Sequence, residues 1–256
     1  MFGVNKRIGG AAVAVLLVLI CCCLSPVVTL AERLTEEREV EPFHSVDLRT
    51  VGHISLTQGD EQSIVIRAER DVLQKLKTEV RGGELIISSK WNIRQAEAPE
   101  IFITITKVRS LKISGSGEIK GEERIFSKDL ELGISGSGDI LLELKAEQLH
   151  TKVSGSGNMS LELEAKYVTT HISGSGDIEM VGLSGSLETR ISGSGSLTAL
   201  DLETREATIR ISGSGNCRVH VRDTLDVRIS GSGDVEYRGN PKVNLSGSGS
   251  GSVRSE

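Results

Sequence analysis

The chain has 256 residues, of which 38% are hydrophobic and only 3% are aromatic, and its formal net charge is −5. Without residues 1–31, which contain two basic and no acidic residues, the net charge is −7. A mildly acidic chain of this kind excludes nucleic acid as an expected partner, and one Trp with two Tyr leaves few platforms for stacking sugars.

The first 31 residues have the pattern of a secretory signal peptide. Lys6 and Arg7 precede an apolar run from Ile8 to Leu24, Pro26 then ends the run, and a cleavage site with small residues reaches Ala31. This order of basic, apolar and small residues is typical of export signals. The sequence therefore predicts that the segment is removed and that the rest of the chain is exported.

Two alternatives to a cleaved signal are less favoured. The apolar run approaches the length that spans a bilayer, so the segment could instead remain as a membrane anchor. Cys21, Cys22 and Cys23 also suggest a lipoprotein, but a lipidation motif needs a small residue before the cysteine, where Ile20 stands.

Residues 32–100 are predicted to form a β-rich cap that is continuous with the repeats that follow. Gly59-Asp60 and Gly82-Gly83 are turn signals between short strand patterns. Strands are expected at residues 45–48, 53–58, 63–68, 77–80, 84–88 and 101–106, and a helical turn at residues 71–76. The cap would cover the edge of the first repeat, which would otherwise be open to pairing.

Residues 114–249 contain the tetrapeptide Ser-Gly-Ser-Gly eight times. Successive copies start 21, 19, 19, 19, 20, 18 and 16 residues apart, at Ser114, Ser135, Ser154, Ser173, Ser192, Ser212, Ser230 and Ser246. A nearly constant period of this length indicates a solenoid, in which each repeat buries its apolar face against its neighbours. Flexible Gly/Ser linkers are the alternative, but every interval carries a strand pattern.

Apolar residues alternate on both sides of each tetrapeptide. The position just before it holds Ile113, Ile134, Val153, Ile172, Ile191, Ile211, Ile229 and Leu245. After it, one polar residue precedes Ile119, Ile140, Met159, Ile178, Leu197, Cys217 and Val235. This period of two predicts strand, corner and strand, with these residues in the core. Cys217, the one cysteine after residue 31, is therefore expected to fill the core.

Glycine and serine at the corner have a steric explanation. If repeats stack about 4.8 Å apart, each corner lies over its copy, and a large side chain there would collide with it. Glycine also permits a positive φ, and stacked serine hydroxyls can hydrogen-bond along the column. These features predict an all-β fold: a single-stranded, right-handed parallel β-helix of roughly seven rungs over residues 101–250, followed by a tail at 251–256.

The chain resembles a known family. The segment EREVEPFHSVDLRTVGHISLTQGDEQSIVIRAERDVLQKLKTEVRGGELIIS, followed by ISGSGDI units, is similar to the auto-transporter adhesin "head GIN" domain family. The resemblance spans residues 37–250 and rests on the combined PFHSV, LTQGD, GGELII and SGSG motifs. It implies an exported β-helical protein of the bacterial cell envelope, in the periplasm, at the outer membrane or on the cell surface. It implies no catalytic residue.

The repeat offers little room for a catalytic cleft. An enzyme on a β-helix builds its cleft from long inserted loops, whereas no interval here exceeds 21 residues. No catalytic motif or Cys/His metal cluster occurs, and the five histidines are scattered. We therefore expect no enzyme activity, no cofactor and no metal site.

A polar residue follows each tetrapeptide. These residues are Glu118, Asp139, Asn158, Asp177, Ser196, Asn216, Asp234 and Ser250. Glycine-rich turns followed by Asp also occur in calcium-binding solenoids, but those have a nine-residue period. We interpret the column as Asx turns and a solvent-facing polar ladder.

A basic column lies two residues before each tetrapeptide. It contains Lys112, Gly133, Lys152, His171, Arg190, Arg210, Arg228 and Asn244, and the strand alternation turns it outward. We call Lys112, Lys152, Arg190, Arg210 and Arg228 the basic stripe, a candidate surface for an acidic polymer such as an envelope polysaccharide. The alternative is that these cations protect the edges and pair with Asp139, Asp177 and Asp234 at the same corners.

Three functions are compatible with the sequence. The leading hypothesis is a non-enzymatic envelope protein, adhesin-like or a scaffold, whose long faces bind a polysaccharide or another protein. A polysaccharide-processing enzyme is the first alternative, and it rests on analogy of fold alone. The second is a structural protein that stacks end to end into homo-oligomers through its last rung.

Overall fold

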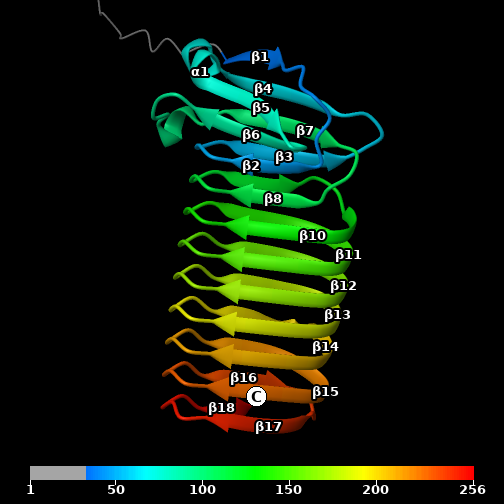
Figure 1. Ribbon diagram of the computed structural model, residues 1–256, viewed down its shortest axis with the longest axis vertical. Coiled ribbons are helices and arrows are strands. Elements are labelled where there is room, and N and C mark those ends of the chain that lie inside the picture. Colours follow the sequence, from blue (N-terminus) through cyan, green and yellow to red (C-terminus); the bar gives the residue numbers. More distant parts are fainter. Residues whose placement is uncertain (1–32) are drawn as a thin grey trace, which may run out of the picture. The chain divides into compact units, whose positions relative to one another are not determined.

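The computed structural model describes residues 33–256, which are almost entirely β-strand (Figure 1). The predicted signal peptide, anchor and lipidation signals at residues 1–31 lie outside this part. Between residues 33 and 256, no helix has the length and apolar character needed to cross a membrane. The elements are β1 (Arg33–Glu37), β2 (Ser45–Leu48), β3 (His53–Gln58), β4 (Ser63–Glu69), α1 (Arg70–Lys75), β5 (Leu76–Arg81), β6 (Glu84–Ser89), a 3-10 helix (Gln95–Glu97), β7 (Glu100–Ile105), β8 (Ser110–Ile113), β9 (Glu118–Gly121), β10 (Ile125–Ile134), β11 (Asp139–Val153), β12 (Met159–Ile172), β13 (Ile178–Ile191), β14 (Leu197–Ile211), β15 (Cys217–Ile229), β16 (Val235–Arg238), β17 (Lys242–Gly247) and β18 (Val253–Ser255).

The strands coil into a parallel β-solenoid, and each turn crosses two faces. In the β11–β12 pair, the register runs from Ile140 to Ala146, omits Glu147 and resumes from Gln148 to Val153. Glu147 and Gln148 are both exposed, so the alternation of buried and exposed residues changes sides there and the strand bends from one face to the other. We call the face that leads into each tetrapeptide the pre-corner face, and the face that follows it the post-corner face.

The predicted all-β parallel β-helix is confirmed, with about 8 turns. In Figure 1 the tetrapeptide corners form one column along an edge of the stack, and the bends of β11 to β15 form the opposite edge. A constant repeat length produces this column because every turn returns to its corner after the same path.

The inward columns form a continuous core. The predicted residues before the tetrapeptides are buried from Ile113 to Ile229, and those after them are buried from Ile119 to Val235. Cys217 is part of this core. Leu245 is the exception, because it lies on the last turn with 61% of its surface exposed. Between two central turns, Thr151 Oγ1 donates to Thr170 Oγ1 at 3.0 Å, which shows how a hydroxyl is accommodated in this core.

Glycine is required at the corners because the backbones of successive turns approach closely. A Cβ on Gly136 would lie 1.8 Å from the carbonyl oxygen of Gly115, and a Cβ on Gly174 would lie 1.9 Å from that of Gly155. The same oxygen of Gly155 accepts a hydrogen bond from Ser175 N at 3.0 Å. The carbonyl that continues the backbone ladder around the corner therefore occupies the space that a side chain would need. The predicted collision between stacked corners is confirmed.

Two details of the predicted corner are wrong. Between residues 33 and 256, the glycines with positive φ are Gly82, Gly83, Gly182, Gly239 and Gly247, so the first seven tetrapeptides contain none. Nor do the corner serines bond to one another in this part of the chain. Ser173 and Ser230 each donate at 3.5 Å to a carbonyl of the preceding turn. Close approach alone explains the glycines.

Two turns without the tetrapeptide precede the repeats, and they stack out of chain order. β2 pairs in parallel with both β6 and β8, and β3 pairs in parallel with both β7 and β9. The turn built from β2 and β3 therefore lies between the turn of β6 and β7 and the turn of β8 and β9 (Figure 1). A Cβ on Gly115 would meet the carbonyl of Thr50 at 2.5 Å, so residues 49–52 act as a corner.

Antiparallel strands and one short helix cover the N-terminal end of these turns. β4 pairs with β7, β1 with β4, and β5 with β6, all antiparallel. The helix α1 adds buried Val72 and Leu73. The strands predicted within residues 45–106 and the helical turn are confirmed to within one residue at each end, whereas β1 was not predicted. Residues 33–105 thus contribute two turns of the solenoid as well as covering strands.

The last turn is two residues out of the predicted register. Ile229 pairs with Gly247, and Ser248 N donates to Ile229 O, so the eighth corner begins at Ser248 and not at Ser246. The predicted tail at 251–256 instead contains β18, in which Val253 pairs with Val235. The run SGSGSGS allows both frames, and the apolar contact of Val253 selects the later one.

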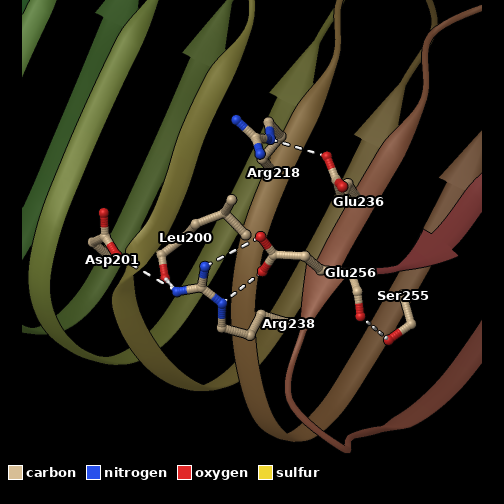
Figure 2. Close-up of polar contacts among 7 residues, drawn as sticks. All are labelled: Leu200, Asp201, Arg218, Glu236, Arg238, Ser255 and Glu256. Atoms are coloured by element: carbon tan, nitrogen blue, oxygen red, sulfur yellow. Dashed lines mark hydrogen bonds and ion pairs between the residues drawn. The ribbon is translucent and has the colours of Figure 1, made fainter.

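Glu256, which follows β18, is also held in place. Arg238 donates to both carboxylate oxygens of Glu256, at 2.6 and 3.2 Å (Figure 2). On its other side Arg238 Nη1 donates to Leu200 O at 3.3 Å and lies 3.5 Å from Asp201 Oδ1. The guanidinium of Arg238 therefore connects three turns of the solenoid on the post-corner face.

The assignment of faces predicts opposite outcomes for two adjacent residues. Ile191 is 1% exposed, so Ile191→Asp should abolish cooperative unfolding, because an unpaired buried charge costs several kcal/mol out of a typical stability of about 5–15 kcal/mol. Arg190→Ala is the control and should cost at most about 1 kcal/mol, since this side chain is half exposed. Thermal unfolding followed by circular dichroism measures both, and equal shifts would contradict the assignment.

The corner geometry predicts that two Gly→Ala changes differ. Gly174→Ala places its Cβ 1.9 Å from a backbone oxygen and should destabilise the protein by at least about 1–3 kcal/mol, because the stacked backbones must separate. Gly133→Ala meets only the flexible Lys112 side chain at 3.3 Å and should be close to neutral. Chemical denaturation measures the difference. A neutral Gly174→Ala would show that the corners do not stack this closely.

Candidate functional site

The members of the basic stripe lie in one column of the pre-corner face. Parallel register places each member beside its counterpart on the next turn. The order along the axis is Lys112, Gly133, Lys152, His171, Arg190, Arg210 and Arg228. The register change at the C-terminus replaces Asn244 by Ser246 as the next member. The predicted stripe residues are therefore brought together, with Lys112 separated from the others by Gly133.

A shallow groove follows the C-terminal part of this column. Its volume is about 630 Å³, and it lies against the tetrapeptide corners. The cationic side of the groove consists of Lys152, Arg190, Arg210 and Arg228 together with His171, and the corner side consists of Ser173, Ser192, Ser212 and Ser230. We call this the basic groove. Each of the four turns from His171 to Arg228 thus offers one basic side chain and one hydroxyl.

Three of the five stripe cations pair with carboxylates on their own face. Arg190 and Arg210 both bind Glu188 Oε1, at 2.7 and 2.9 Å, and Lys112 lies 3.5 Å from Glu131 Oε2. Among residues 33–256, neither Lys152 nor Arg228 forms an ion pair. Because a guanidinium has five N–H donors, one bond to Glu188 leaves each arginine with four more. Glu188 thus positions two arginines without saturating them.

The predicted pairing of the stripe with Asp139, Asp177 and Asp234 is wrong. Asp139 Oδ1 accepts from Asn158 N at 3.0 Å, Asp177 Oδ1 from Ser196 N at 2.8 Å, and Asp234 Oδ1 from Ser252 N at 2.7 Å. These carboxylates lie on the post-corner face and serve the backbone of the next turn. Within the described chain, no ion pair therefore joins the two columns.

The polar column after the corners is a hydrogen-bonded ladder between turns. From Asp139 onward, the side-chain oxygen of each member accepts the backbone N–H of the member below, through Asn158, Asp177, Ser196, Asn216 and Asp234 to Ser252. Where the member above is His53 or Glu118, the N–H donates instead to a glycine carbonyl, Gly52 O or Gly117 O. Only short oxygen-bearing side chains reach the N–H, which explains the Asp, Asn and Ser in this column. The polar-ladder interpretation is confirmed, although the bonds run between turns and do not form Asx turns.

The post-corner face carries a second shallow groove of opposite charge. Glu118, Asp139, Asp177 and Glu179 line it, and its volume is about 720 Å³. Between residues 33 and 256, no group of three His, Cys, Asp or Glu side chains is close enough to hold a metal ion. Burial raises the pKa of the Cys217 thiol to about 12, so this cysteine carries no thiolate at neutral pH.

The sequence did not identify two features of the groove. Glu188 was missed because it lies two residues before Arg190, in a column that shows no charge pattern of its own. The corner serines were expected to be small and to hydrogen-bond to one another, although four of them line the groove. The hydroxyls could have been found by asking which side of the corner each serine faces.

The ladder predicts an acid-side dependence on pH. Hydrogen bonds from the side chain and backbone of Ser252 lower the pKa of Asp234 from its ordinary value of about 3.9. The lowered pKa means that this contribution to stability is present above pH 3.9 or so and is lost as the pH falls through the folded-state pKa. Ser252→Ala should raise the pKa of Asp234 toward its ordinary value, as measured by NMR titration. Ser250→Ala is the control, and an ordinary pKa in the unmodified protein would contradict the ladder.

Comparison with known proteins places the chain in a structural group. None of the curated proteins matches it. A crystal structure named a putative lipid binding protein from Parabacteroides distasonis is 24% identical with a TM-score of 0.83, covering 89% of this chain and 98% of that one. A putative adhesin from the same organism is 20% identical with a TM-score of 0.83, covering 88% and 98%. A putative adhesin from Parabacteroides merdae is 20% identical with a TM-score of 0.81, covering 89% and 97%. These likenesses show the fold.

Family membership rests on the sequence model. The model described as "Putative auto-transporter adhesin, head GIN domain" matches residues 42–183 and 143–241, which together include most of the chain. The match contains the stacked corners, the basic groove and the two turns that precede the repeats. The chain therefore belongs to the putative auto-transporter adhesin, head GIN domain family.

Proposed function

We propose that the protein is a non-enzymatic, exported protein of the cell envelope that holds an anionic polysaccharide along its basic groove. The observation that carries this proposal is the run of five basic side chains on consecutive turns, three of which, Lys152, His171 and Arg228, have no carboxylate partner within the described residues. Membership of an adhesin family and the signal-like pattern at residues 1–31 support export. Recovery of the protein from the cytoplasmic fraction of the cells would contradict the proposed export.

Local charge matters more than net charge here. The chain is acidic overall, with a formal net charge of −5, so a polyanion would be repelled by most of the surface. Charges beyond about 8 Å are largely screened at physiological salt, and the bound polymer would therefore respond mainly to the groove beneath it. The groove also follows five successive turns, which suits a chain-like ligand rather than a compact one.

The shape of the molecule supports binding rather than catalysis. Each tetrapeptide corner is four residues long, and the opposite bend takes about one residue, so neither edge carries a long loop in the repeat region. Side chains on such faces are displayed in straight columns and do not converge on one point. An extended surface of this kind suits an adhesin-like or scaffold role.

The proposal predicts retention of anionic glycans through the groove. The change is the fourfold variant Lys152→Ser, Arg190→Ser, Arg210→Ser and Arg228→Ser, tested on an array of anionic and neutral glycans. If each contact contributes about 0.5 kcal/mol, affinity should fall by about 30-fold. Binding by the unmodified protein should also weaken as salt rises, because the contacts are exposed.

The control removes the same charge from other surfaces. Lys145→Ser, Lys166→Ser, Arg218→Ser and Arg222→Ser also delete four exposed cations, all of them in ion pairs outside the groove. This variant should keep its affinity if the groove is the binding site. Equal losses of affinity in the two variants would show that net charge, and not the groove, determines binding. An unmodified protein that binds no anionic glycan would refute the proposal.

A further inference from the structure

The basic groove has a fixed repeat along the axis. Lys152, His171, Arg190, Arg210 and Arg228 are paired in register from one strand to the next, without an omitted turn. Neighbouring strands lie about 4.8 Å apart, so five turns present basic side chains over about 19 Å. The spacing is set by backbone hydrogen bonds and cannot adapt to a ligand. A ligand that uses every turn must therefore carry its own charges at nearly the same interval.

Each turn also offers the same kind of donor set. One basic side chain lies on one side of the groove and one corner serine on the other, at Ser173, Ser192, Ser212 and Ser230. A guanidinium binds a carboxylate with two parallel N–H donors, and a serine hydroxyl can donate to or accept from a sugar hydroxyl. On four successive turns, the groove thus repeats one basic side chain that can donate to a carboxylate of the ligand and one serine hydroxyl that can bind a sugar hydroxyl.

We propose that the ligand is a linear polyuronate, a sugar polymer with a carboxylate on every residue, lying parallel to the solenoid axis. The length of an extended pyranose residue is close to the strand spacing of about 4.8 Å. A carboxylate on every sugar therefore supplies one charge per turn, within reach of the long basic side chains beneath the polymer. A polymer with a carboxylate on every second sugar would use only every second turn. This inference rests on the proposed function and names the ligand class for the same groove.

The positions of the charged side chains favour one orientation of the polymer relative to the solenoid axis. Across the strands, the neighbouring outward column places Glu188 beside Arg190 and Asp226 beside Arg228, so an anionic chain crossing the face at either turn would meet a carboxylate. Along the axis, the chain stays above basic side chains and corner hydroxyls. Charge therefore favours the axial path, and the straight column of corners in Figure 1 allows a straight chain to follow it.

The test is a length series of oligogalacturonates from two to eight residues, with affinity measured by calorimetry on the full chain. Affinity should rise with each added residue until about five turns are covered and then level off, because further residues extend past Arg228 or Lys152. Hyaluronan oligosaccharides with the same number of carboxylates are the matched probe and should bind about tenfold more weakly. Affinity that is independent of length, or equal for the two series, would overturn the inference.

Two substitutions locate the polymer. Arg210→Ser interrupts the column near its middle and should reduce the affinity of the five-residue oligomer by about tenfold while affecting the two-residue oligomer much less. Lys145→Ser, on the post-corner face and half exposed, should change neither. Circular dichroism checks that both variants fold. An equal effect of Arg210→Ser at every length would also overturn the inference.

The outcomes separate this inference from the proposed function. If all anionic glycans bind equally and the fourfold groove variant loses them, the groove is a general anion site and the match of spacing is wrong. If no anionic glycan binds, both proposals fail. A length-dependent preference for oligogalacturonate that the fourfold variant abolishes supports both.

Discussion

The structure depends on the approach of successive corner backbones. At each corner, a glycine carbonyl points along the axis to accept an N–H of the next turn, and it occupies the space that a Cβ would fill. Any side chain there would force the turns apart and break the ladder on both faces at once. Because every turn meets this condition at the same point of its path, the corners align and the rest of each turn follows in register.

The position after the corner shows how the backbone ladder is completed. There the N–H turns away from the glycine carbonyl of the preceding turn and donates to a short side-chain oxygen, as from Asn158 N to Asp139 Oδ1. Buried or half-buried backbone donors need a partner, so the column accepts Asp, Asn and Ser in alternation. Residues that look like calcium ligands in the sequence are thus engaged in holding the turns together.

Register also decides what the surface can do. Parallel pairing places chemically similar residues directly above one another, which produces a basic groove on one side of the corner column and an acidic groove on the other. A single exposed cation contributes little to affinity in water. A column of them on a rigid backbone contributes through repetition, because the spacing of the charges is already fixed before any ligand arrives.

The sequence determined the solenoid, its core and its basic stripe, because a period of about nineteen residues with alternating apolar positions has one way to bury Ile172 or Ile191 on every turn. It did not determine the partners of Arg190 or Asp177, which depend on what the next turn brings alongside. Nor could it place β2 and β3 between later strands, since that turn lacks the tetrapeptide and stacks out of chain order. The frame of the last corner was equally open, because SGSGSGS reads two ways until Val253 packs below Val235. The local sequence pattern determines whether a residue is buried or exposed. Only the stacked structure determines which residue of the next turn it contacts.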